Sequence, residues 1–250
     1  MSSTFLTAEW RRLIMANYVI APELLMDYLP AGTELDLYYG HCFVSLIGFY
    51  FHNVRLNGFR IPFHQNFEEV NLRFYVRRLL PTGEARRGVV FVREIVPLRA
   101  ISFVANTLYG ERYVVASMKH VWSETNEGMQ TAYRWKSHGH WCGMESTAQK
   151  ELVPIEPGTV EEFITEHYWG YAKKRSGHTV EYAVRHPRWQ QYSVRSFSTD
   201  ADFGMLYGER FAALTGRAPD NVLLAEGSEI AVLNGQTLSR PGLPRNDHTF

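Results

Sequence analysis

The sequence predicts a β-rich α+β fold, most economically a closed antiparallel β barrel with a few peripheral helices. Many segments that alternate in polarity follow one another and are separated by clear turn residues, whereas helical spacing is rare. Closing the sheet would remove its exposed edges and leave an interior lined by every second residue. The chain has 250 residues, of which 45% are hydrophobic, and this is enough for one domain with a substantial core.

The first predicted elements are a short helix over residues 21–30 and two strands over 33–40 and 41–56. The helix has apolar residues at helical spacing and ends at Pro30, and a tight turn at Gly40-His41 joins the two strands. Turn residues then separate further predicted strands, which cover 69–80, 87–97, 112–125 and 129–146.

The C-terminal half mixes helices with strands. Residues 160–175 form the best predicted helix, because acidic residues come early and basic residues late, which suits the helix dipole. A strand over 178–194 and a helix over 201–216 follow it. The last regular element is a predicted hairpin over 221–235, whose two halves are apolar.

No linker or internal repeat divides the chain, so we expect a single barrel domain over residues 1–235 followed by a loose tail over 236–250.

Acidic and basic residues number 26 each, so no overall electrostatic field draws the chain to nucleic acid or to a membrane, and we expect neither as a partner. The N-terminus lacks the apolar core of a signal peptide, and the two cysteines, Cys42 and Cys142, suit a reducing compartment. These features predict a cytoplasmic protein.

Three metal-type ligands, His138, His140 and Cys142, alternate along one predicted strand. Neighbours on one strand face lie about 7 Å apart, and three in a line rarely converge on one tetrahedral ion. We therefore favour a solvent-exposed or rim position for them, and whether they bind a metal stays open. We therefore assign no metal ligands. The chain has neither a nucleophile elbow nor a glycine-rich phosphate loop, and we expect no cofactor.

A second stretch with candidate functional residues is "VRHPRWQQY", residues 184–192. Pro187 forces an extended backbone at His186, which is typical of a kinked edge strand with Trp189 packed beside it. In the alternative interpretation, Trp169 and Trp189 cover one end of the barrel and His186 serves as a general base. No acid stands near His186 in the sequence to support that role.

Residues 69–76 carry the most informative alternation. The apolar set, Val70, Leu72, Phe74 and Val76, alternates with a polar set that begins at Glu69, Asn71 and Arg73. The polar set is either a wetted strand face or the wall of an interior cavity. In a cavity, the Glu69 carboxylate would suit general acid–base chemistry, and the Arg73 guanidinium would suit a bidentate contact with a substrate carboxylate.

Four stretches occur together in the order of one known family: residues 24–51, 67–76, 106–118 and 181–189. On these stretches, and over most of its length from about Trp10 onward, the chain resembles the YqjF-like family of bacterial proteins of unknown function. That family is similar to the acetoacetate decarboxylase superfamily. The resemblance implies a closed, cone-like antiparallel β barrel with an internal pocket, and it implies that the strand of Glu69 supplies the pocket wall.

The resemblance also assigns individual residues. In the decarboxylases a pocket glutamate follows an aromatic residue by two positions, and Phe67 followed by Glu69 matches that spacing. The decarboxylases also carry two adjacent lysines shortly after a glycine, the first of which forms a Schiff base. If Gly110 corresponds to that glycine, Tyr113 and Val114 stand in place of the lysines, and Lys119 lies further along alone. We therefore expect no Schiff base.

The predicted function is that of a small-molecule-binding protein with an internal barrel pocket that lacks the Schiff-base lysine. Glu69 is the pocket acid or base, and Tyr113 is a hydrogen-bond donor or weak acid, unless it is only a packed tyrosine. Asn71 forms part of the hydrogen-bonding wall, Arg73 is the anion partner, and Arg112 is a candidate at the rim. The expected ligand is a carboxylate or a carbonyl compound.

Two alternatives stay open. The first is an enzyme that acts on an oxo acid or a related carbonyl compound by lyase- or hydrolase-type acid–base chemistry. Such an enzyme should place Glu69 within hydrogen-bond reach of a second titratable group and should perturb its pKa. The second alternative is a barrel with a filled interior that serves protein contacts. The oligomeric state is also open, a homo-oligomer included.

Overall fold

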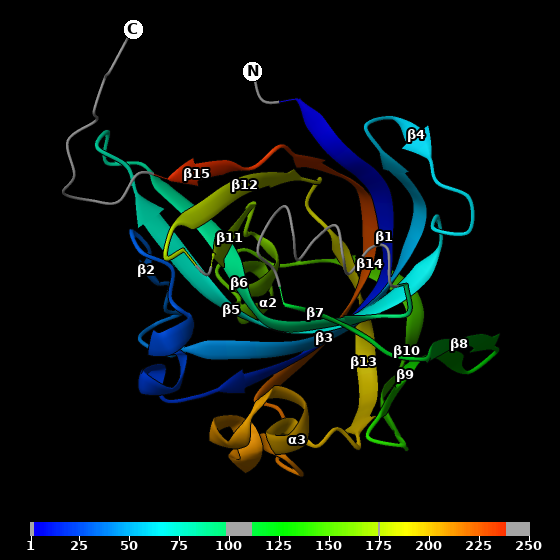
Figure 1. Ribbon diagram of the computed structural model, residues 1–250. Helices are drawn as coiled ribbons and strands as arrows, with labels where there is room; N and C mark the ends of the chain where they lie inside the picture. Colours follow the sequence, from blue (N-terminus) through cyan, green and yellow to red (C-terminus); the bar gives the residue numbers. More distant parts are fainter. Residues whose placement is uncertain (1–2, 99–111, 175, 239–250) are drawn as a thin grey trace, which may run out of the picture.

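The computed structural model describes residues 3–98, 112–174 and 176–238. Its central feature is a closed ring of strands in the order β11–β6–β5–β3–β1–β14–β12, which closes because β12 pairs with β14 (Figure 1). Neighbouring strands of the ring are antiparallel, except that β11 runs parallel to β6. The ring strands are β1 (Thr4–Val19), β3 (Phe43–Leu56), β5 (Phe67–Leu79), β6 (Ala85–Val96), β11 (Trp169–Lys173), β12 (Thr179–Arg185) and β14 (Asn221–Leu233).

A second group of strands leaves the ring at β14, which also pairs with β13. The sheet then continues through β10 and β9 to β8, which projects from the ring in Figure 1. The bounds of these strands are β8 (Met118–Thr125), β9 (Gly128–Ser137), β10 (His140–Pro154) and β13 (Gln190–Thr199). Short strands extend the ring edges, namely β2 (Glu34–Leu35), β4 (Phe59–Arg60), β7 (Tyr113–Val115) and β15 (Gln236–Leu238).

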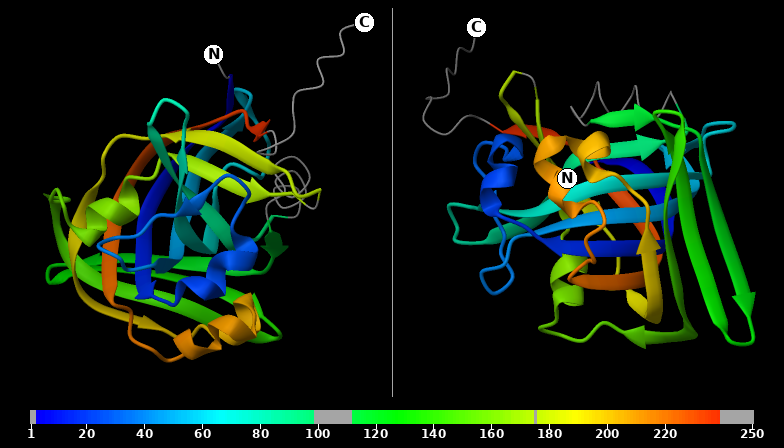
Figure 2. Two further views of the ribbon diagram at one scale, coloured as in Figure 1. Left: turned by 90° about the vertical axis from the view of Figure 1, so that its left-hand side faces the viewer. Right: turned by 90° about the horizontal axis from the view of Figure 1, so that it is seen from below.

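The helical segments are short: η1 (Pro22–Tyr28), α2 (Val160–Thr165), α3 (Phe203–Tyr207) and η2 (Glu209–Leu214). Helix α2 is seen within the outline of the ring in Figure 1, and its Phe163 and Ile164 belong to the interior core. Figure 2 shows η1, in blue, and α3 with η2, in orange, on the outside of the ring. No helix of the described residues is long and apolar enough to cross a membrane.

Both faces of β5 are largely buried over residues 67–76. On β5, Leu72 and Phe74 pack in an outer core against side chains of β9 and α3, such as Tyr133 and Phe203. The opposite face of β5 looks into the ring, where Phe67 and Tyr75 join the interior core. Glu69 and Asn71 lie on this inner face and are each 2% exposed. The polar set of β5 is therefore enclosed and is not a wetted face.

The predicted β-rich architecture is confirmed, but the helix expected over 160–175 is wrong after Thr165. Trp169–Lys173 instead form β11, which pairs with β12 through a backbone ladder. The ring of Tyr182 lies over Gly170 on the neighbouring strand, where a Cβ would force that ring to move. Long-range strand pairing thus overrides the local helical spacing.

The hairpin expected over 221–235 is also wrong, since β14 runs through this region as one strand. Gly227 has a φ of 82° and lies opposite Arg11, and a Cβ there would clash with the carbonyl of Trp10. The glycine therefore allows close contact between strands and is not a turn. The helix expected over 201–216 is broken at Gly208, whose φ is 109°.

Further segments differ from expectation, among them the strand predicted over 129–146, which a turn at His138 and Gly139 divides into β9 and β10. The strand predicted over 178–194 is interrupted at residues 186–189, around Pro187, which separates β12 from β13. Gln236–Leu238, which we assigned to a loose tail, pair with β12 as β15. The rest of that tail, residues 239–250, lies outside the described residues.

Candidate functional site

The ring encloses a cavity of about 150 Å³. Most of its wall is apolar and aromatic, and it includes Trp10, Phe49, Phe51, Phe67, Phe91 and Trp189. Polar side chains line it as well, namely Glu69, Asn71, Arg73, Glu94, Tyr113, Thr165, His167 and His186. A small number of polar groups in a largely apolar concave wall is typical of a small-molecule site.

Glu69 is a buried acid of this wall. Asn71 Nδ2 donates a 2.9 Å hydrogen bond to its Oε1, and the Tyr113 hydroxyl donates a 3.3 Å bond to its Oε2. Burial raises the pKa of Glu69 to about 7, although these two hydrogen bonds and the nearby Arg73 charge act to lower it. The carboxyl group can therefore either take up or release a proton near neutral pH.

Arg73 is a half-buried cation in the same wall. Its Nη2 donates a 3.2 Å hydrogen bond to the Ile164 carbonyl, and its guanidinium lies 5.5 Å from the centre of the Tyr75 ring. Within the described residues it forms no ion pair, and its Nε has no hydrogen-bond partner. A guanidinium without a carboxylate partner is suited to an anionic group of a ligand.

The structure brings four of the five predicted site residues together. Glu69, Asn71 and Arg73 share one face of β5, and Tyr113 reaches Glu69 from β7, which runs beside β6. Arg112 is different, because it does not line the cavity and its guanidinium lies 4.7 Å from the ring centre of Tyr28. Gly110, on which the comparison with the lysine pair depends, lies outside the described residues.

Glu94 lines the cavity but was missed by the sequence analysis. Its strand pairs with β5, and Asn71 lies opposite Glu94. Val89 and Phe91 also line the cavity, so strict alternation would turn residue 94 outward. A bulge opposite Leu72 and Arg73 changes the register and brings Glu94 inward.

His167 was also missed, because it lay inside the predicted helix 160–175. It follows α2 and lines the cavity together with Thr165. Trp169, His186 and Trp189 line the cavity too. The side chain of His167 contacts Asp36, which lies 131 residues away in the chain. Local sequence patterns carry no signal of such a contact.

The alternating group His138, His140 and Cys142 does not gather around a point. His138 and His140 are exposed at the β9–β10 hairpin, whereas Cys142 is buried and burial raises the pKa of its thiol. In the part of the chain that the structure describes, no group of three histidine, cysteine or acidic residues is placed to hold a metal ion.

The lysines also lie away from the cavity. None of the chain's lysines is among its lining residues, although all of them are in the described part of the chain: Lys119, Lys136, Lys150, Lys173 and Lys174. The Lys119 ammonium lies 4.5 Å from the ring centre of Trp141, on the projecting sheet.

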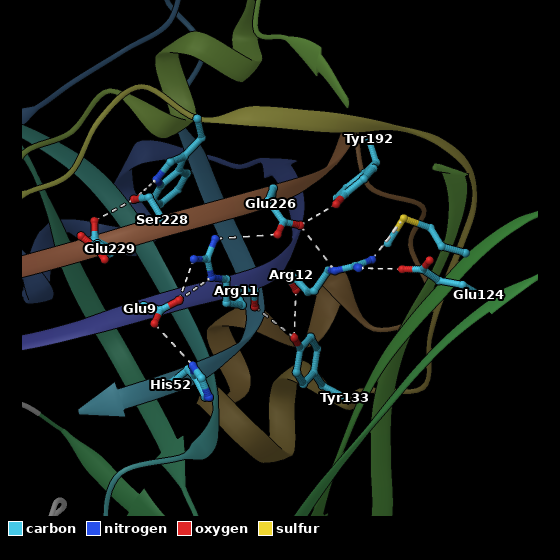
Figure 3. A network of polar contacts seen from close by, with 12 residues as sticks. Glu9, Arg11, Arg12, His52, Glu124, Tyr133, Tyr192, Glu226, Ser228 and Glu229 are labelled. Carbon is cyan, nitrogen blue, oxygen red and sulfur yellow. Dashed lines mark hydrogen bonds and ion pairs between the residues drawn. The ribbon is translucent and has the colours of Figure 1, made fainter. Parts of the chain in front are cut away.

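A second polar cluster lies at the bulge of β1, where Arg12 has a φ of 53° (Figure 3). Arg12 pairs with Glu124 at 2.8 Å and with Glu226 at 3.4 Å, and the Tyr133 hydroxyl donates to the carbonyl of Arg12. Arg11 pairs with Glu9 at 2.6 Å. Both arginines of this cluster thus have carboxylate partners, which is the expected pattern of a structural network.

The comparisons with known proteins agree with this fold. The model of the DUF2071 family, described as an uncharacterized conserved protein, matches residues 7–229. The uncharacterized protein YqjF of Bacillus subtilis is 25% identical over 181 residues, which cover 71% of this chain and 72% of YqjF.

Solved structures share the fold at low sequence identity. Acetoacetate decarboxylase from Legionella pneumophila superposes with a TM-score of 0.65 at 12% identity, covering 95% of this chain and 88% of that one. The enduracididine biosynthesis enzyme MppR, complexed with pyruvate, gives 0.65 at 13% identity, covering 96% and 92%. An acetoacetate decarboxylase-like enzyme from Sphingomonas wittichii gives 0.64 at 13% identity, covering 95% and 94%. These likenesses establish a fold of the acetoacetate decarboxylase type.

Proposed function

The chain belongs to the DUF2071 family of uncharacterized conserved proteins, and from that premise we propose that its ring cavity binds a small carbonyl compound with a carboxylate group and exchanges a proton with it. The observation that carries this proposal is the enclosed Glu69, whose pKa is raised to about 7 and which Tyr113 approaches within 3.3 Å. An acid–base group with a pKa near the working pH is the expected feature of a proton-transfer site.

The proposed chemistry uses three side chains. Arg73 binds the carboxylate of the compound, since it has no carboxylate partner among the described residues. Ionised Glu69 takes a proton from the carbon beside the carbonyl, and the electron pair of that C–H bond forms the carbon–carbon double bond of an enolate. The negative charge develops on the former carbonyl oxygen, to which the Tyr113 hydroxyl donates a hydrogen bond. The proton on Glu69 then exchanges with water, and transfer of a solvent-derived proton from Glu69 to the carbon completes the exchange.

The proposal does not include a Schiff base. Such chemistry needs an amine in the cavity, and the lysines of this chain lie elsewhere. The fold of MppR, whose structure contains pyruvate, makes short oxo acids reasonable first probes. The size of the cavity agrees with this choice, since a cavity of 150 Å³ suits a ligand of about six non-hydrogen atoms.

A second candidate function is binding without chemistry, which is favoured by the largely apolar wall of the cavity. The same cavity argues against the remaining interpretation, a barrel whose interior is filled by side chains. Binding and proton exchange differ in one measurable respect, because only the second labels the ligand in heavy water.

We would incubate the protein in D₂O with 2-oxobutanoate and follow the loss of its C3 proton signal by ¹H NMR, with thermal shift as the binding assay. The wild type should speed the exchange, and Glu69→Gln should slow it by about 100-fold or more. Glu34→Gln is the matched control, because Glu34 is exposed and pairs with Arg77. A thermal shift without exchange would support the binding function, and the absence of both would overturn the proposal for oxo acids.

Arg73 is tested in the same assay. Arg73→Met keeps the apolar stem and removes the cation, so we expect the half-saturating concentration of 2-oxobutanoate to rise about tenfold or more. Arg77→Met is the control, since Arg77 lies on the same strand and its guanidinium pairs with Glu34 at the surface. Equal effects of the two variants would move the anion site away from Arg73.

A further inference from the structure

His167 is the imidazole of the cavity wall whose surroundings are most fully defined. Its side chain is 1% exposed. The ring packs between aromatic groups, with its centre 4.7 Å from that of Tyr75 and 5.1 Å from that of Phe163. Neither the sequence motifs nor the proposed proton transfer gives it a role.

One ring nitrogen of His167 has a clear partner. Nε2 lies 3.1 Å from Asp36 Oδ2, and the same oxygen accepts a 2.6 Å hydrogen bond from Arg87 Nε. Burial tends to raise the pKa of Asp36, but the hydrogen bonds from His167 and Arg87 outweigh it and hold that pKa below its usual range. An ionised carboxylate only accepts hydrogen bonds, so the proton must be on Nε2.

The other nitrogen, Nδ1, then carries a lone pair. Burial lowers the pKa of His167 to about 4, and the charges of Arg87 and Arg73 act in the same direction, while Asp36 opposes them. The imidazole is therefore neutral at physiological pH, and Nδ1 can accept a hydrogen bond but cannot donate one. A base this weak is better suited to recognition than to proton abstraction.

Nδ1 is buried and has no hydrogen-bond partner in the described parts of the chain. Leaving such an atom unpaired is unfavourable, because it loses the hydrogen bond that it would make in water. Asn71 Oδ1, a second acceptor of the cavity wall, is buried without a described partner as well. The wall thus combines a cation, Arg73, with two unpaired acceptors.

From this geometry we propose that His167 Nδ1 accepts a hydrogen bond from the bound ligand, so that the cavity selects carboxylates that also carry a hydroxyl or amino donor. The inference rests on the proposed function for the place of the ligand, and it narrows the class of ligand from any short oxo acid to one with a donor group. Asp36 has a positioning role, because it holds the tautomer that exposes the lone pair.

The test uses two probes of nearly equal shape. 3-Hydroxypyruvate and 2-oxobutanoate share the oxo acid group and differ by a hydroxyl in place of a methyl group. By calorimetry, the wild type should bind 3-hydroxypyruvate about tenfold more tightly. In His167→Gln the amide nitrogen can still donate to Asp36, but the amide oxygen is bonded to Cδ and does not occupy the position of Nδ1 beside Cγ, so the preference should fall to about one. His140→Gln, an exposed histidine on β10, should leave the preference unchanged.

A measurement on the wild type covers the case in which His167→Gln does not fold. ¹⁵N NMR of the histidine side chains at pH 7 should show His167 as the neutral tautomer with its proton on Nε2. A proton on Nδ1, or a charged ring, would overturn the inference and leave the proposed function standing. Equal binding of both probes would do the same. If neither probe binds, the ligand class is wrong and both proposals fall.

Discussion

Glu181 and Glu69 are both buried, but they differ in their partners: Glu181 pairs with arginines, whereas Glu69 accepts hydrogen bonds from neutral groups. Glu181, on β12, accepts hydrogen bonds from Arg78 and Arg86, at 2.9 and 2.8 Å, and from Gln236 and Tyr171. Burial acts to raise its pKa, but Gln236 and the two arginines outweigh this effect and hold the pKa below its usual range. Glu181 is therefore a fixed anion that joins β5, β6, β11 and β15 to β12.

Glu69 has no such set of partners. It accepts hydrogen bonds from the neutral groups of Asn71 and Tyr113, and its pKa is about 7. Burial alone therefore does not determine whether a carboxyl group stays charged. A carboxylate whose charge is compensated stabilises the fold, whereas one left with neutral partners beside a cavity is available for proton transfer.

The sharpest test of this comparison is the stability of two matched variants. Glu181→Gln should lower the free energy of unfolding by about 3 kcal/mol, because it leaves the charges of Arg78 and Arg86 partly buried without an anion. Glu69→Gln should change it little or raise it at neutral pH, because a neutral amide replaces an unfavourable buried charge. Urea unfolding measures both values. Equal losses in the two variants would contradict the distinction.

The two acids should also make stability depend on pH in opposite directions. The pKa of Glu69 is about 7 in the folded protein and near 4.5 when unfolded, so the folded state stays protonated to a higher pH than the unfolded state. The contribution of Glu69 to the free energy of unfolding is fully present below the unfolded pKa and is lost as pH rises to about 7. The total loss is roughly 3 kcal/mol.

Glu181 contributes with the opposite sign. Its folded pKa is lowered, so its stabilisation is present above the unfolded pKa and is lost as pH falls through the folded pKa. Unfolding midpoints of the wild type and both variants between pH 4 and 8 check these signs. Glu69→Gln should remove the loss of stability between pH 5 and 7, and an unchanged profile would show that Glu69 ionises normally.

The smallest expected effect concerns Tyr113. Its hydroxyl donates to Glu69 at 3.3 Å and so favours the charged carboxylate. Tyr113→Phe should raise the pKa of Glu69 further and should slow proton exchange about fivefold, as expected for one hydrogen bond. ¹³C NMR titration of the Glu69 carboxyl measures the pKa directly. Tyr39→Phe is the control, because Tyr39 is 82% exposed.

Much of the site was accessible from the sequence. The alternation of β5 put Glu69, Asn71 and Arg73 on one face, and the family resemblance drew attention to Tyr113. Glu94 was missed because a bulge changes the alternation of its strand. His167 was missed because its segment has helical spacing. Arg112 was expected at the rim, and in the structure its guanidinium lies over Tyr28 and it is not a lining residue of the cavity.

The sequence by itself determined the β-rich class, most strand positions and which side chains of β5 share a face. These properties are local, since residues two apart on a strand point to the same side wherever that strand lies. Only the tertiary structure decided that this face is enclosed, because enclosure depends on β12 pairing with β14 to close the ring. It also decided which of two buried glutamates is compensated, since the arginines of Glu181 come from strands about 100 residues away in the chain.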